Sequence, residues 1–360
     1  MSIFAKRNLH IGSTLTAIVL LFAGVVQGSY AATEKAATEA GKKGQFLGAK
    51  ETVFPSWFKE SFLDFNEDVK EAAAAGKRIM MLFEQDGCPY CNAMVEKNLS
   101  QKDIEEKVRK NFDVIAINMW GDRELLTVGG KKFTEKSFSA ALKVQFTPTV
   151  LFFNEMGELV LRLNGYLPPD KFMTALDYVS QKKEKEMTYN DYVAKFAPKQ
   201  SSGGLNKKPY FKPPPYDLKA QLNANKPIAV FFEQTQCPNC DTLHNKTLAN
   251  KETENIVNNF ISVQLDMWSN QKVITPEGKS TTAREWAKQL QVKYAPSIVL
   301  FDTQGKEVIR SEAFFKSFHT QGIFDYVSSG AYKKEPSFQR YLSERAEHLI
   351  EQGKNVNIWE

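Results

Sequence analysis

The chain contains an internal duplication, and this feature constrains its fold more than any other. Short motifs of the first half recur in the second half in the same order, at an interval of about 148 residues. A preserved order of landmarks indicates two tandem copies of one domain rather than a single large core. The landmarks, each followed by its second copy, are Phe83-Glu84-Gln85 and Phe232-Glu233-Gln234, Cys88-Pro89-Tyr90-Cys91 and Cys237-Pro238-Asn239-Cys240, Met119-Trp120 and Met267-Trp268, and Gly157 and Gly305.

The duplication and the composition around it divide the 360 residues into segments. Residues 198–216 are rich in Ser, Gly and Pro, which predicts a linker that is flexible at first and stiff at its proline-rich end. Ala, Thr, Lys and Glu dominate residues 32–52, which predicts a disordered lead-in. The predicted segments are a signal peptide at 1–31, the lead-in at 32–52, a first domain at 53–197, the linker at 198–216, a second domain at 217–345 and a C-terminal tail at 346–360.

Residues 1–31 have the pattern of a secretory signal peptide. Lys6 and Arg7 form a short basic region, and residues 11–27 are apolar and uncharged. Ser29-Tyr30-Ala31 supplies a small-x-Ala cleavage site, which favours removal of the segment after Ala31. The alternative is an uncleaved membrane anchor, because the apolar run is only slightly shorter than a membrane span. Both readings predict that the rest of the chain is exported.

The four cysteines form two identically spaced pairs, Cys88 with Cys91 and Cys237 with Cys240. A bridge within so short a segment removes little conformational entropy from the unfolded chain, and domains of this size need no disulfide framework. The pairs are therefore predicted to serve chemistry. Two alternatives are ligation of one zinc ion by all four thiolates and purely structural bridges. The formal net charge of +5 is spread along the chain and gives no argument for a nucleic-acid partner.

The order of apolar runs and helical stretches predicts an α/β fold for each copy. In the first copy, residues 78–83, 113–118, 149–153 and 158–163 are runs of strand length, and helical stretches precede or follow them. The resulting order β-α-β-α-β-β-α predicts a central mixed sheet flanked by helices, with a parallel pair joined by a crossover and a final hairpin. The second copy has the same order of elements.

Each Cys-x-x-Cys pair follows the first buried strand directly and opens a helix, which is the position of a redox motif in such a unit. Free N–H groups and the helix dipole at this position favour a thiolate. Cys88 and Cys237 are therefore predicted to be the attacking nucleophiles. Cys91 and Cys240 lie one turn further along the helix and are predicted to be the resolving thiols. No metal or cofactor is predicted at these sites.

Both copies resemble thioredoxin-fold domains. In addition to the cysteine pair, each has the proline that precedes the third strand in that family, in Thr147-Pro148 and Ala295-Pro296. The resemblance implies that Pro148 and Pro296 are cis and pack against the disulfide. It also implies that the backbone of Thr147 and Ala295 pairs with the bound substrate. The alternative is an ordinary proline at a strand edge.

More narrowly, several segments resemble the periplasmic SoxW-like thioredoxins and the DsbC-type catalytic domains near them. These segments are the two FEQxxCPxC motifs, the regions of Trp120 and Trp268, Gly165-Tyr166, and the stretch GAYKKEPSFQRY from Gly330. The resemblance implies a periplasmic protein that exchanges disulfides with oxidised or reduced protein substrates. It further implies a membrane thiol transporter of the DsbD or CcdA kind as electron donor. The duplication departs from the single-domain pattern of those proteins.

One residue of the thioredoxin pattern is missing. Leu82 and Phe231 stand where cytosolic thioredoxin has a buried Asp that moves protons during resolution. Glu84 and Glu233, at the ends of the same strands, are candidate proton acceptors in its place, and solvated strand-end acids are the alternative. His244, shortly after the second pair, is predicted to be an ordinary, partly exposed side chain.

Three functions fit these observations. A reductase of oxidised envelope proteins ranks first. A disulfide oxidase or isomerase ranks second, because redox potentials vary widely across this fold. The third is a non-catalytic module whose cysteines hold a metal. Trp120 and Trp268 are predicted to pack beside the two sites.

Overall fold

The computed structural model describes residues 43–196, 204–313 and 315–359. The predicted signal peptide at 1–31 and most of the predicted lead-in therefore lie outside the described residues. Within those three ranges, no helix combines the length and the apolar character that a membrane span requires.

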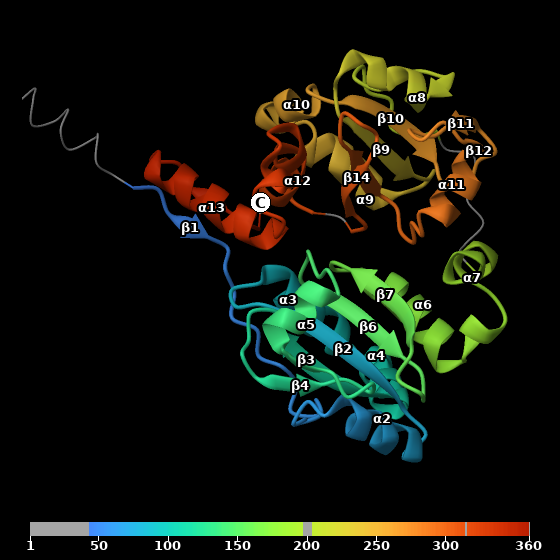
Figure 1. The fold of residues 1–360 in the computed structure, drawn as a ribbon, viewed down its shortest axis with the longest axis vertical. Helices are drawn as coiled ribbons and strands as arrows, with labels where there is room; N and C mark the ends of the chain where they lie inside the picture. The colour runs from blue at the N-terminus through green and yellow to red at the C-terminus, as the bar shows by residue number, and fades with distance from the viewer. Residues whose placement is uncertain (1–42, 197–203, 314, 360) are drawn as a thin grey trace, which may run out of the picture. The chain divides into compact units, whose positions relative to one another are not determined.

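The first domain is built on a four-stranded sheet in the order β3-β2-β6-β7. Strand β2 (Arg78–Glu84) pairs in parallel with β3 (Phe112–Asn118) and antiparallel with β6 (Thr149–Phe153). Strand β6 then forms an antiparallel hairpin with β7 (Leu159–Asn164). The predicted mixed sheet, with its parallel pair and final hairpin, is confirmed (Figure 1).

Helices lie on both faces of this sheet. They are α2 (Phe65–Ala74), α3 (Pro89–Ala93), the π-helical segment η1 (Met94–Leu99), α4 (Lys102–Asn111), α5 (Glu135–Ala141), α6 (Pro169–Ser180), the 3₁₀ turn η2 (Lys183–Lys185) and α7 (Tyr189–Phe196). A small hairpin, β4 (Glu124–Leu126) with β5 (Lys132–Thr134), was not predicted; its strands are only three residues long, too short to show a clear apolar pattern.

The second domain repeats this arrangement, with the sheet order β10-β9-β13-β14. Its four strands are β9 (Ile228–Glu233), β10 (Ile261–Asp266), β13 (Ser297–Phe301) and β14 (Glu307–Ser311), and their pairing directions match those of the first domain. The remaining elements are β8 (Tyr216–Asp217), α8 (Leu218–Gln221), η3 (Leu222–Ala224), α9 (Pro238–Thr242), η4 (Leu243–Thr247), α10 (Lys251–Val257), β11 (Lys272–Ile274), β12 (Ser280–Thr282), α11 (Ala283–Gln289), α12 (Ser317–Ser328) and η5 (Ala331–Lys333).

The central strands are apolar throughout because both faces of the sheet are covered. Along β2, alternate side chains enter opposite cores. Met80 and Leu82 pack with α4 and α6 on one face, while Met81 and Phe83 pack with α2 and α5 on the other. This burial fixes the strand, so its carboxyl end and the cysteine pair that follows have a rigid support.

Residues 204–216, part of the predicted linker, pack on the second domain. The N–H of Lys212 donates to the carbonyl of Ser262 at 2.8 Å, and the ring of Phe211 packs edge-on against Phe231. The first domain has the same feature, because the N–H of Lys59 donates to the carbonyl of Val114 at 2.8 Å. This part of the segment is therefore an ordered entry to the second domain. The composition predicted a linker, but it did not indicate that Phe211 would anchor this segment to the second domain.

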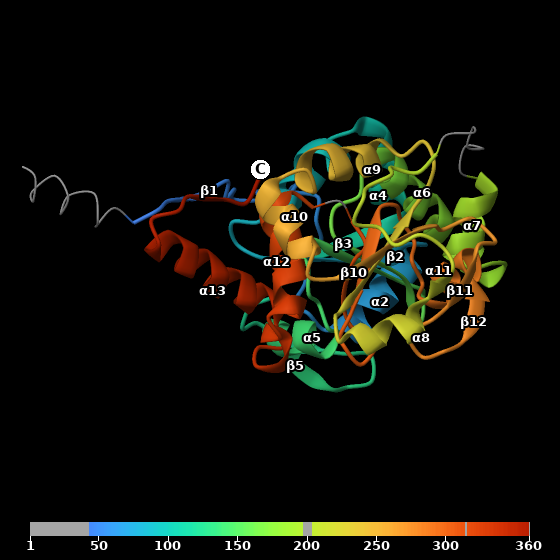
Figure 2. The same ribbon diagram turned by 90° about the horizontal axis from the view of Figure 1, so that it is seen from above.

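The two ends of the described chain also differ from expectation. Phe46–Leu47, in the predicted disordered lead-in, form strand β1, which pairs in parallel with β15 (Val356–Asn357). Helix α13 (Phe338–Glu351) continues past residue 346, where the tail was predicted to begin. Strand β1 and the end of α13 lie side by side, since the N–H of Gly44 donates to the carbonyl of Ile350 (Figures 1 and 2). Composition could not reveal a partner so distant in the sequence.

Candidate redox sites

The first cysteine pair lies at the point where β2 ends and α3 begins. Cys88 is the N-cap of α3, and its sulfur accepts the backbone N–H of Cys91 at 3.1 Å. Pro89 follows at the first helical position, where its missing N–H costs no hydrogen bond. Cys88 and Cys91 form a disulfide with a Cα–Cα distance of 5.3 Å. The helix continues through η1, so one sulfur of the bridge faces the free N–H groups of a helix start.

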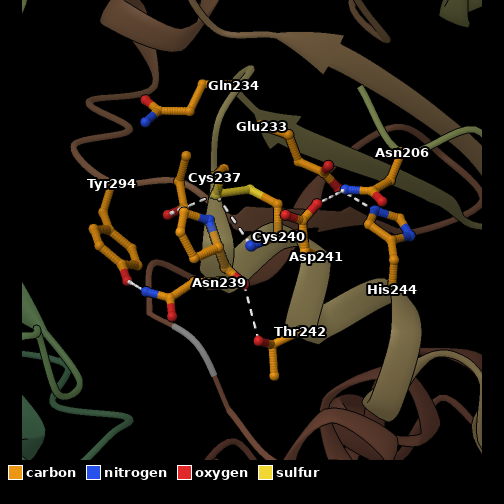
Figure 3. Close-up of a disulfide and its surroundings, with 12 residues drawn as sticks. Asn206, Glu233, Gln234, Cys237, Asn239, Cys240, Asp241, Thr242, His244 and Tyr294 are labelled. Atoms are coloured by element: carbon orange, nitrogen blue, oxygen red, sulfur yellow. Dashed lines mark hydrogen bonds and ion pairs between the residues drawn. A yellow bond between two sulfur atoms is a disulfide. The ribbon is translucent and has the colours of Figure 1, made fainter. Parts of the chain in front are cut away.

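The second pair has the same construction (Figure 3). Cys237 caps α9, and its sulfur accepts the N–H of Cys240 at 3.1 Å. The two form a disulfide with a Cα–Cα distance of 5.1 Å. Cys237 Sγ also lies 3.7 Å from the carbonyl oxygen of Ala295. The side chain of Asn239, between the two cysteines, donates to the hydroxyl of Tyr294.

The two cysteines of each pair differ in exposure. Cys88 and Cys237 are 3% and 6% exposed, whereas Cys91 and Cys240 are fully buried. The first cysteine of each pair is therefore the more accessible of the two, although all four are buried when the disulfides are formed.

Each site is completed by the segment that precedes β6 or β13. The Thr147-Pro148 and Ala295-Pro296 peptide bonds are cis. Thr147 and Ala295 are 5% and 9% exposed, and Ala295 contacts the cysteine sulfur as described above. The prolines lie immediately before the strands that pair with β2 and β9, so both copies bring this segment to the carboxyl end of the strand that carries the cysteines.

Glu84, at the end of β2, is partly buried. Burial raises the pKa of its carboxyl group to about 7, and the negative charges of Asp86 and Glu135 act in the same direction, while Arg123 opposes them. Glu135 is itself buried and paired with Arg123 at 2.6 Å. Glu84 is therefore an acid in a poorly solvated position beside the first site, and not a fully solvated strand-end acid.

Glu233, the counterpart of Glu84, is fully buried and has two side-chain partners. Its Oε1 lies 2.7 Å from Nε2 of His244, and its Oε2 accepts a hydrogen bond from Nε2 of Gln264 at 3.0 Å. The prediction that His244 is a partly exposed side chain is wrong: its exposure is 0%. The sequence position suggested a helix surface, but residues 204–212 cover that face, and Phe211 packs against the imidazole ring.

A hydrogen bond from each tryptophan supports the loop before each cysteine pair. Trp120 Nε1 donates to Oε1 of Gln85 at 2.9 Å, and Trp268 Nε1 donates to Oε1 of Gln234 at 3.0 Å. Sequence reasoning predicted the tryptophans as packing residues and missed this pairing. The sequence did contain an indication of this pairing, because Gln85 and Trp120 of the first copy recur as Gln234 and Trp268 in the second.

A cavity of about 470 Å³ adjoins the first site. Cys88, Pro89 and Thr147 line it on one side, and Phe318 and Leu342 line it on another. Tyr90 also lines this cavity, and its hydroxyl accepts the N–H of Lys316 at 3.0 Å.

The geometry defines a class. Two domains of the same α/β fold each hold a cysteine pair at a helix N-terminus, with a disulfide formed within the pair, and this is the construction of a thiol–disulfide oxidoreductase. Among the described residues, no group of three or more His, Cys, Asp or Glu side chains is placed to hold a metal ion.

Comparison with known proteins identifies the family. The model of the thioredoxin-like domain matches residues 65–180 and 214–327. These ranges cover more than half of the chain and include both cysteine pairs, so the chain belongs to the thioredoxin-like domain family. No curated protein matches the chain in sequence.

Solved structures of single thioredoxin-fold domains are also similar to part of the chain. A thioredoxin-fold protein from Helicobacter pylori is 18% identical, with a TM-score of 0.33, over 39% of this chain and 86% of that one. The oxidoreductase DsbH is 13% identical, with a TM-score of 0.26, over 37% and 88%. The C-terminal domain of DsbD from Neisseria meningitidis, in its oxidised form, is 18% identical, with a TM-score of 0.24, over 32% and 87%. The family assignment rests on the domain model and not on these likenesses.

Proposed function

We propose that this protein is an exported thiol–disulfide oxidoreductase that reduces disulfides of envelope proteins at two sites. The observation that carries the proposal is the same at both sites. The first cysteine caps a helix, and the second is fully buried behind it. This arrangement suits a reaction in which one sulfur meets the client and the other resolves the product.

The reaction at the first site proceeds in two exchange steps. The thiolate of Cys88 attacks one sulfur of a client disulfide, forms a mixed disulfide and releases the other client sulfur as a thiolate. The thiol of Cys91 then loses its proton, and its sulfur attacks Cys88. The Cys88–Cys91 bond forms, the second client sulfur leaves as a thiolate, and the client has gained two electrons. Cys237 and Cys240 have the corresponding roles at the second site.

The buried cysteine needs a proton acceptor, because Cys91 and Cys240 have no contact with solvent. Glu84 and Glu233 are proposed for this role. A carboxyl group whose pKa is about 7, as at Glu84, is well matched to accept a proton near neutral pH. Thr147-Pro148 and Ala295-Pro296 are proposed to hold the client backbone beside the attacking sulfur.

Export and the reducing direction rest on the sequence. The signal-like pattern of residues 1–31 supports export to the periplasm, and the resemblance to SoxW-like thioredoxins supports reduction. A membrane thiol transporter would then return electrons to the oxidised pairs. Client proteins with accessible disulfides would be its partners.

The redox state of the four cysteines in intact cells tests the direction. Acid quenching and alkylation of the full chain should find both pairs mostly reduced. Mostly oxidised pairs, with a potential above that of the glutathione pool, would instead indicate an oxidase. Stoichiometric zinc bound to all four thiolates would contradict an oxidoreductase altogether. Fractionation of the full chain, compared with a chain lacking residues 1–31, tests export.

A further inference from the structure

The second site contains a buried polar cluster that the first site lacks. Glu233, at the end of β9, and His244, in η4, are both fully buried and lie 2.7 Å apart. Their contact closes a loop of the chain that contains the whole Cys237–Cys240 pair. Figure 3 shows the two side chains directed toward each other. The cluster therefore fixes the two ends of the segment that carries the Cys237–Cys240 pair.

The two partners of Glu233 are specific to the second copy. Val95 occupies the position of His244 in the first copy, and Ala116 occupies the position of Gln264, as the strand register shows. Neither residue can donate a side-chain hydrogen bond to a carboxylate. A buried carboxyl group is costly unless it is paired. In the second copy, where Glu233 is more deeply buried than Glu84, His244 and Gln264 supply that pairing, one at each carboxylate oxygen.

The surroundings hold the imidazole ring in place. The ring packs against Phe211 at 5.7 Å and Phe231 at 6.5 Å between ring centroids. Among the described residues, Nδ1 of His244 has no hydrogen-bond partner, so the contact with Glu233 is what orients the ring. The other titratable groups nearby are Tyr210, in residues 204–216, Asp241 of α9 and the two cysteines. Burial, and then the negative charges of Glu233 and Glu254, raise the pKa of Tyr210.

We propose that His244 is a positioning residue of the second site, which holds the Glu233 carboxyl group in place to accept the proton of Cys240 during resolution. The inference rests on the thiol–disulfide exchange proposed above. In the step concerned, Cys240 gives its proton to the Glu233–His244 pair and its sulfur bonds to Cys237. The bond between Cys237 and the client sulfur breaks, and the client leaves as a thiolate with the bonding electrons. The first site performs the same step with Glu84, which has neither of these side-chain partners.

The test isolates the second site in the full chain with Cys88→Ser and Cys91→Ser. Reduced protein is mixed rapidly with the aromatic disulfide dithiobis(nitrobenzoate). The first equivalent of coloured thiolate reports attack by Cys237, and the second reports resolution by Cys240. His244→Val, which installs the residue of the first copy, is expected to slow the second phase about tenfold or more near pH 7. The first phase should be unchanged, and the second should rise more steeply with pH than in the parent.

Two further variants separate positioning from packing. His244→Phe fills the same space without a donor, so it should reproduce the selective slowing even if His244→Val does not fold. His244→Gln places an amide donor near the position of Nε2, so it should restore the second phase at least in part. Val95→Ala, in the full chain with Cys237→Ser and Cys240→Ser, is the matched control at the first site and should leave both phases unchanged.

The outcomes distinguish this inference from the proposed function. An unchanged second phase in His244→Phe, or equal slowing of both phases in every variant, would overturn the role of His244 while leaving the exchange reaction intact. A parent protein with no first phase would overturn the exchange reaction at this site.

Discussion

Gln85 joins Trp120 to Gln339. Its side-chain oxygen accepts the indole N–H of Trp120 at 2.9 Å, and its side-chain nitrogen donates to Oε1 of Gln339 in α13 at 2.9 Å. Gln339 in turn donates to the backbone carbonyl of Gln145 at 2.9 Å. The loop before the first cysteine pair is thus part of a hydrogen-bonded chain that reaches the segment leading to Pro148.

Gln85→Ala is expected to destabilise the protein more than Gln234→Ala. Both substitutions leave a partly buried indole N–H without its partner, at a cost of about 1 kcal/mol. Gln85→Ala also removes the partner of Gln339, which adds a loss of similar size. Urea unfolding of the two variants measures the difference. Equal losses would show that the contact with Gln339 contributes nothing.

Cys91→Ser is expected to accumulate a mixed disulfide through Cys88, because attack remains possible and resolution does not. Cys240→Ser should do the same through Cys237. Non-reducing gels and mass spectrometry of the trapped species identify both the sulfur used and the client. If clients are trapped by Cys91 in a Cys88→Ser protein and not by Cys88 in Cys91→Ser, the assigned roles are reversed.

Glu84→Gln is expected to change how stability depends on pH. The folded state raises the pKa of Glu84 to about 7 from 4.5, so between these values the folded chain binds more protons than the unfolded chain. Stability from this group is complete below about pH 4.5 and is lost as the pH rises through 7. The loss is smaller than the roughly 3 kcal/mol that the full shift would give, because solvent screens a partly exposed carboxyl group.

The measurement compares the free energy of unfolding of wild type and Glu84→Gln at several pH values. As the pH rises from about 4.5 to about 7, the free energy of unfolding of Glu84→Gln should increase relative to that of wild type. Glu124→Gln, at an exposed position in the same domain, should run parallel to wild type. A constant difference between Glu84→Gln and wild type would mean that Glu84 titrates normally.

The two sites are expected to differ in redox potential. Tyr90 lies between the cysteines of the first pair, and its ring is buried against Phe315 and His319. Its counterpart Asn239 is more exposed and bonds to Tyr294. Residues at this position influence the stability of the thiolate, and about 30 mV corresponds to about 1.4 kcal/mol.

Glutathione buffers can poise each site alone, with the other pair replaced by serine. Unequal midpoints, together with a wild-type turnover above the sum of the two single-site proteins, would support electron exchange between the domains. Equal midpoints with additive turnover would indicate two independent sites of one kind.

Gly157→Ala is expected to destabilise the first domain. Gly157 has a φ of 77° in the turn between β6 and β7, and an added Cβ would lie 2.7 Å from a methyl group of Val128. Strain and crowding together should cost about 1–3 kcal/mol. Thermal unfolding measures the loss, and Gly129→Ala, where an added Cβ meets nothing within 4 Å, is the control. Equal melting temperatures for the two variants would contradict this expectation.

The sequence was sufficient to predict the structure of the segments that are duplicated or that have a clear pattern of apolar residues. The apolar runs at β2 and β9 and the cysteines that follow them predicted the sheets, and the duplication predicted two domains. The environment of His244 could not be predicted, because it depends on Phe211 packing back from a segment that reads as linker. The contrast between Glu84 and Glu233 was also hidden, because both end the same motif and differ only through residues distant in sequence, such as Gln264.

The pairing of β1 with β15 has a consequence for how the protein is made. Phe46 meets Val356, and the N–H of Gln45 donates to the side chain of Asn355 across 310 positions of the chain. A ribosome releases the first of these residues long before it has synthesised the last. The strands of both four-stranded sheets are synthesised before residue 356, so both sheets can assemble first, and the pairing of β1 with β15 forms after them.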